Sequence, residues 1–136
     1  MSEVLAGAMA GVVMSLYCLG LGALALPRLS RGVVYRRLLP PGTQLTLLFL
    51  LIAVAVPPLW LLLGTMSGLG YKIAAASFVG SGLGSPNIVY TVGTVGVAAA
   101  LCLLLSLLGR SAFRYWLALS LGIAATFGWL LPWLAQ

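Results

Sequence analysis

The sequence has no histidine, and its one carboxylate, Glu3, lies close to the N-terminus. Metal and haem sites draw their ligands mainly from histidine, cysteine and carboxylate side chains. Proton relays inside a membrane use acidic residues or histidine, and general acid–base catalysis near neutral pH depends on the same groups. We therefore expect no catalytic residues, no metal site and no cofactor bound through the chain's own side chains. The protein is not expected to be an enzyme.

Cysteine is also scarce. Cys18 and Cys102 each lie inside an apolar run, and neither has a C-x-x-C partner. This placement favours small buried side chains over a disulfide. The glycine-rich run Gly80–Gly84 lacks both the spacing and the lysine of a phosphate-binding loop, so nucleotide binding is not expected.

Charged residues are scarce as well. Of 136 residues, 6% are charged and 62% are hydrophobic, with a mean hydropathy of +1.18. Soluble proteins contain about 25% charged residues, so the composition predicts an integral membrane protein. The net charge of +6 comes from basic residues at the ends of apolar runs rather than in one patch. Contact with membrane lipids is therefore expected, and nucleic-acid binding is not.

Four apolar runs predict four transmembrane helices, at about residues 4–26, 45–64, 87–108 and 115–135. The first run alone would rise about 34 Å at 1.5 Å per residue, enough to cross a bilayer core. Pro27 is expected to end it, and Pro57-Pro58 should kink the second helix because proline has no N–H. The expected fold is an all-α membrane protein, a single domain over residues 1–136, with four helices in two hairpins.

The glycine-rich segment Thr65–Ser85 is expected to connect the two hairpins on the outer side of the membrane. Reading it as a span would bury Lys72, at a cost of about 2.5 kcal/mol on insertion scales. Its middle, Tyr71–Val79, is predicted to form a short interfacial helix. Tyr71, Lys72 and Phe78 would then face head groups or a partner subunit.

Arginine sets the predicted orientation. The loop after the first run carries Arg28, Arg31, Arg36 and Arg37, and the turn between the last two runs carries Arg110 and Arg114. Short arginine-rich loops stay on the cytoplasmic side. Both termini would then lie on the opposite side of a bacterial inner or an organellar membrane. We expect these six arginines to contact lipid head groups or a partner.

Small residues recur along three of the predicted helices, where they allow other helices to approach closely. The candidate packing residues are Gly7, Gly11 and Ser15, then Thr94, Ala98, Cys102 and Ser106, and finally Ser120, Ala124 and Gly128. Three such faces exceed what a four-helix bundle needs internally. We therefore expect a non-catalytic accessory subunit of a larger membrane complex, energy-converting in the respiratory or photosynthetic sense. Its partners would be lipids and other integral membrane subunits, with a pigment or quinone at a partner interface left open.

The alternative is a homo-oligomeric channel or carrier for a neutral or anionic solute. Its pore would need polar residues on one face at mid-depth. The candidates are Thr91, Thr94, Ser106 and Thr126.

Overall fold

The computed structural model describes residues 2–32, 37, 42, 44–77, 88–108 and 110–135. Its long helices are α1 (Glu3–Leu29), α3 (Leu45–Ser77), α4 (Ile88–Leu108) and α5 (Phe113–Ala125). A 3-10 turn, η1 (Arg110–Ala112), precedes α5, and a π-helix, η2 (Thr126–Leu130), joins α5 to α6 (Leu131–Leu134). The prediction of an all-helical chain is confirmed for the described residues. Four helical stretches are long and apolar enough to cross a membrane, as expected of an integral membrane protein.

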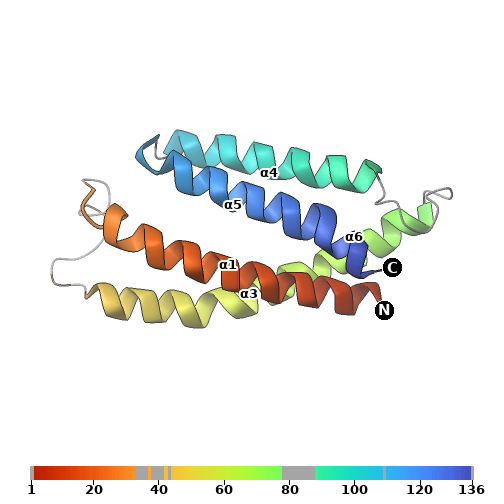
Figure 1. Cartoon of the computed structure of the whole chain (residues 1–136), viewed down its shortest axis with the longest axis horizontal. Helices are drawn as coiled ribbons and strands as arrows, with labels where there is room; N and C mark the ends of the chain where they lie inside the picture. The colour runs from red at the N-terminus through yellow and green to blue at the C-terminus, as the bar shows by residue number, and fades with distance from the viewer. Residues whose placement is uncertain are drawn as a thin grey trace.

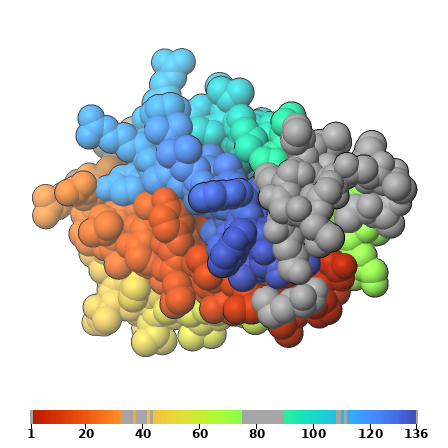
Figure 2. Space-filling view, turned by 45° about the vertical axis from the view of Figure 1, so that its right-hand side comes forward, coloured from red at the N-terminus to blue at the C-terminus, as the bar shows by residue number. Residues whose placement is uncertain are grey.

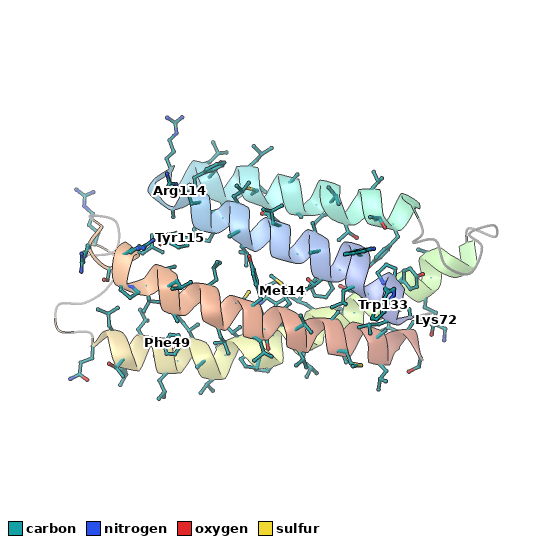
Figure 3. The ribbon with its side chains drawn as sticks, viewed as in Figure 1. Met14, Phe49, Lys72, Arg114, Tyr115 and Trp133 are labelled. Carbon is teal, nitrogen blue, oxygen red and sulfur yellow. The ribbon has the colours of Figure 1, made fainter. Side chains whose placement is uncertain are left out.

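On the left of Figure 1 the helices lie in the order α4, α5, α1, α3, and on the right the green part of α3 passes behind α1 and rises towards the end of α4. α1 packs along α3 on one side and meets α5, η2 and α6 on the other, whereas α4 packs on α5 and η2. Figure 2 shows the dark-blue C-terminal residues seated against the red and orange surface of α1. The two termini lie at the same end of the molecule (Figure 1). Arg114 lies at the opposite end, which we call the arginine end (Figure 3).

The second span is longer than expected. We predicted a helix ending at Gly64 and a connector over Thr65–Ser85, but α3 continues without a break to Ser77 and has 33 residues. The physical reason is that Gly64 and Gly68 pack against the backbone of α1, so these glycines belong to a helix contact. Tyr71 and Lys72 therefore lie near the end of a long helix and not in a separate interfacial one. The rest of the expected connector, including Phe78, lies outside the described residues.

Proline does not end α1 where expected. Pro27 lies inside α1, which continues to Leu29. Proline removes the hydrogen bond to the carbonyl four residues earlier, and only two helical residues follow Pro27. The Ser30 N–H donates to the Leu26 carbonyl at 2.9 Å, and its hydroxyl donates to the Pro27 carbonyl at 3.0 Å. In α3, Pro57 and Pro58 lie mid-helix, and the helix changes direction between its yellow and green parts (Figure 1).

Candidate functional site

The closest helix contact joins α1 to α3. Gly7 and Gly11 are buried and face Gly64 and Gly68 in an antiparallel register. A Cβ added at Gly7 would collide with the Gly64 carbonyl, and one at Gly64 would collide with the Gly7 carbonyl. Such backbone approach is possible only for glycine, and it maximises van der Waals contact in a solvent that gives no hydrophobic drive.

The remaining predicted packing residues lie mainly between α4 and the α5–η2 segment. Ala98, Cys102, Ser120 and Gly128 are buried, while Thr94, Ser106 and Ala124 are half-buried. A Cβ at Gly128 would lie 3.8 Å from side-chain carbons of Thr91 and Thr94. On α1, Ser15 is buried and its hydroxyl donates to the Val12 carbonyl at 2.9 Å. The small faces seen in the sequence are thus largely used inside the molecule.

All four long helical segments meet at η2. The Thr126 hydroxyl donates to the Gly122 carbonyl at 2.6 Å and lies 3.5 Å from the Met14 sulfur of α1. The next residue, Phe127, stacks on Trp60 of α3 with ring centroids 5.9 Å apart. The carbonyl of Gly128 accepts a hydrogen bond from the Thr91 hydroxyl of α4 at 3.0 Å. Three successive residues of the π-helix therefore hold the three other long helices, and π-helical turns are frequent at functional sites.

Pro132 explains the hydrogen bond from α4. It is fully buried four residues after Gly128, and it has no N–H to give to the Gly128 carbonyl. Inside a bilayer an unsatisfied carbonyl costs several kcal/mol, and the Thr91 hydroxyl gives the Gly128 carbonyl a donor from α4. Our sequence interpretation missed this site although Pro132 signals it. The donor could not be named from sequence, because Thr91 lies 37 residues away in the chain.

The core beside η2 is apolar. Ala10, Met14, Phe127 and Leu131 form its buried centre, with Cys18, Trp60, Tyr71, Leu119 and Ile123 packed around it. Within the described ranges, no three side chains among histidine, cysteine, aspartate and glutamate come together. Ser120 Oγ and Trp116 Nε1 are buried without a hydrogen-bond partner among the described atoms. The junction offers packing and hydroxyl groups that fix helix positions.

The predicted outer segment and the arginines lie at opposite ends. Tyr71 is half-buried and packs edge-on against Tyr90 of α4, with ring centroids 5.1 Å apart, so it docks on this chain rather than on head groups alone. Lys72 is exposed beyond it (Figure 3). The arginines for which exposure is described, Arg28, Arg31, Arg37, Arg110 and Arg114, are all exposed. Arg36 lies outside the described residues.

The hydroxyls considered for a pore donate hydrogen bonds to backbone carbonyls. Thr94 donates to the Tyr90 carbonyl at 2.8 Å, and Ser106 donates to the Leu103 carbonyl at 2.6 Å. Thr91 and Thr126 donate to Gly128 and Gly122 as described above. Each of these hydroxyls therefore donates its proton to a backbone carbonyl, as serine and threonine often do in helices.

Comparison of the chain with known protein families, with curated proteins and with solved structures finds no match.

Proposed function

We propose that this chain is a non-catalytic subunit of a larger membrane complex, bound to a transmembrane helix of another subunit through the outer face of α4. One observation carries the proposal. Gly93 and Gly96 are exposed, and a Cβ added at either would meet no atom of the described residues within 4 Å. With the exposed Ala100 they form a small-residue strip on the side of α4 facing away from Ala98 and Cys102, which are buried. We call Gly93, Gly96 and Ala100 the α4 strip.

A lipid-facing glycine needs an explanation. In a helix, glycine costs roughly 0.5–1 kcal/mol relative to alanine, and lipid tails gain no special contact from its small size. A neighbouring helix does gain, because small residues let backbones approach. Gly7 and Gly64 make such a contact within this chain.

The rest of the exposed surface suits lipid. Beyond Ala100, α4 exposes Leu103, Leu104 and Leu107, and the first half of α3 exposes Leu47, Leu50 and Leu51. The α4 strip is therefore one part of the described surface where small residues replace bulky ones; the exposed Gly20 and Gly70 lie on other helices. The α4 strip is better evidence for a partner subunit than the three small-residue faces expected from sequence, because those faces largely contact other helices of this chain.

The proposed placement follows from charge. Arg28, Arg31, Arg110 and Arg114 gather at the arginine end, whereas Glu3 lies at the end that holds the termini. By the positive-inside rule the arginine end would be cytoplasmic, in a bacterial inner or an organellar membrane, with both termini opposite. The sequence has no histidine and no intramembrane carboxylate, which suits a subunit that supports an energy-converting complex without carrying its chemistry.

Purification in mild detergent tests the proposal. The wild-type chain and the control variant Gly20→Phe should co-purify with a second membrane protein in fixed stoichiometry, because Gly20 is also exposed with open space around it. Gly96→Phe should purify without that protein and yet unfold at the same temperature as wild type. Recovery of all three proteins as lone monomers would contradict the proposal, as would equal loss of the partner from Gly20→Phe. The channel alternative has no comparable support, since its four hydroxyls donate to backbone carbonyls.

A further inference from the structure

The packing of α3 on α1 differs on the two sides of Pro57-Pro58. After the prolines, Gly64 and Gly68 are buried, and both meet the backbone of α1. Before them, none of the residues from Leu45 to Val56 is buried, and no glycine brings the two backbones together. Regions with few buried contacts are the ones that open most readily. The first part of α3 is therefore less firmly held than the second.

The buried residues of α1 show the same division. Six of the seven lie between Ala6 and Ser15, and the seventh is Ala25. Gly20 and Gly22 lie in the other half of α1, and a Cβ added at either would meet no atom of the described residues within 4 Å. The antiparallel packing places this half beside the part of α3 that precedes the prolines (Figure 1). The two helices are thus tightly packed at the end that holds the termini and loosely packed at the arginine end.

Ring contacts of α3 also begin only after the prolines. Trp60 stacks on Phe127 of η2 with ring centroids 5.9 Å apart, and Tyr71 meets Tyr90 of α4 at 5.1 Å. Within the described part of the chain, no pair of rings joins residues 45–56 to another helix. The second part of α3 is thus fixed to α1, η2 and α4, whereas the first part lies beside α1 (Figure 1).

The two prolines weaken the helix between these parts. Pro57 and Pro58 have no N–H, so the carbonyls of Ala53 and Val54 lose their usual donors within the helix. Two successive helical hydrogen bonds are therefore absent from the stretch where α3 changes direction (Figure 1). Proline is a common cause of such kinks, and hinges in proteins are a few residues that absorb a change of backbone angles.

We propose that α3 has a hinge at Pro57-Pro58. Residues 45–56 swing away from α1 at the arginine end, while residues 60–77 stay fixed to α1, η2 and α4. The swing uncovers the face of α1 that carries Ala25, which is buried in the structure. The chain can thus change its shape at the arginine end without loosening the core beside η2. This inference does not depend on the α4 strip.

Distances between spin labels, measured by double electron–electron resonance on the full chain in liposomes, test the hinge. Both native cysteines are first replaced by alanine. One labelled pair, Leu24→Cys with Leu47→Cys, reports on the arginine end, and a control pair, Leu5→Cys with Met66→Cys, reports on the other end. All four side chains are exposed, and both pairs follow the antiparallel register of the glycine contact. The first pair should give a broad distribution of distances and the control pair a narrow one.

Restoring the missing donors tests whether the prolines cause the spread. Pro57→Ala combined with Pro58→Ala returns both N–H groups, and it should narrow the distribution between positions 24 and 47 to the width of the control pair. Pro27→Ala also returns an N–H, but near the end of α1, and should leave that distribution broad. Equal widths for the two pairs without any proline substitution would overturn the proposal, and this comparison stands even where the double variant fails to fold. A distribution that stays broad in a folded double variant would overturn it as well.

Discussion

Single glycine residues determine how closely the helices of this chain approach. Gly64 lies against the carbonyl of Gly7, and Gly68 lies against the carbonyl of Glu3. Backbone atoms cannot rotate away as a flexible side chain can, so any added Cβ must push the two helices apart. Gly70, two residues beyond Gly68 on the same helix, has no atom of the described part of the chain within 4 Å of an added Cβ. The two kinds of glycine in α3 should therefore respond differently to the same substitution.

Gly64→Ala should destabilise the protein by about 1–3 kcal/mol, the usual cost of overpacking. Gly70→Ala should be neutral or slightly stabilising, because alanine is the better helix former. Unfolding in detergent, followed by circular dichroism against increasing denaturant, measures both. Equal stability of the two variants would show that α1 and α3 are not in backbone contact at Gly64.

The hydrogen bond from Thr91 makes a second prediction at this scale. Thr91→Val should cost about 0.6 kcal/mol and no more than about 1.7 kcal/mol, the average and the maximum measured for hydrogen bonds between membrane helices. Thr94→Val should cost less, because the Thr94 hydroxyl donates only within its own helix, to Tyr90. In a Pro132→Ala background the backbone can again donate to Gly128, so the effect of Thr91→Val should shrink. Additive costs of Thr91→Val and Pro132→Ala in a double-mutant cycle would contradict the link between these two residues.

The sequence allowed part of this detail to be predicted. Gly7 and Gly11 were visible as a small face, because they recur at helical spacing within a clear apolar run. Of their partners, Gly64 was placed at the end of the second span and Gly68 in the connector, because Lys72 made the following segment look too costly to continue the helix. Lys72 is exposed near the end of α3, where a lysine side chain can reach the head groups. The cost that we assigned to burying it therefore does not arise.

Among the elements, α3 is the one whose length was misjudged. Its 33 residues rise about 50 Å at 1.5 Å each, which exceeds a core of about 30 Å. A helix of that length must tilt, bend or extend beyond the hydrocarbon. Pro57 and Pro58 place a bend near its middle. The part of α3 after the bend brings the ring of Trp60 against Phe127 and the ring of Tyr71 against Tyr90. Such long-range contacts are invisible to a reading based on local hydropathy.

Cysteine labelling in membranes tests the length of α3. In a background with Cys18 and Cys102 replaced by alanine, Lys72→Cys should react with a membrane-impermeant maleimide, and Leu62→Cys should not. Met66→Cys should also stay unreactive, although its side chain is exposed in the isolated molecule, because lipid covers it. An interfacial connector beginning at Thr65 would instead make Met66→Cys as reactive as Lys72→Cys.

At the scale of the whole molecule, α3 and α4 are the outer helices at the arginine end, and they meet through Tyr71 and Tyr90 near the other end (Figure 1). Helix class and the number of spans followed from sequence, because length and hydropathy decide them. The π-helix at Thr126–Leu130 did not, because its contacts with Met14, Trp60 and Thr91 come from three other helices. The α4 strip could not be identified either, because apolar residues lie on all sides of α4. Only the position of α5 shows which side is covered. Which small face stays uncovered is a property of the assembled helices.

The most direct test of the central claim is photo-crosslinking at the α4 strip in native membranes. A photoreactive benzoylphenylalanine placed at Gly96 should yield one discrete adduct with another integral membrane protein. The same group at Leu50, an exposed leucine of α3, should yield no protein adduct. Lipid adducts alone at both positions, or an adduct of twice the mass of this chain at Gly96, would contradict the claim that α4 docks on a different subunit.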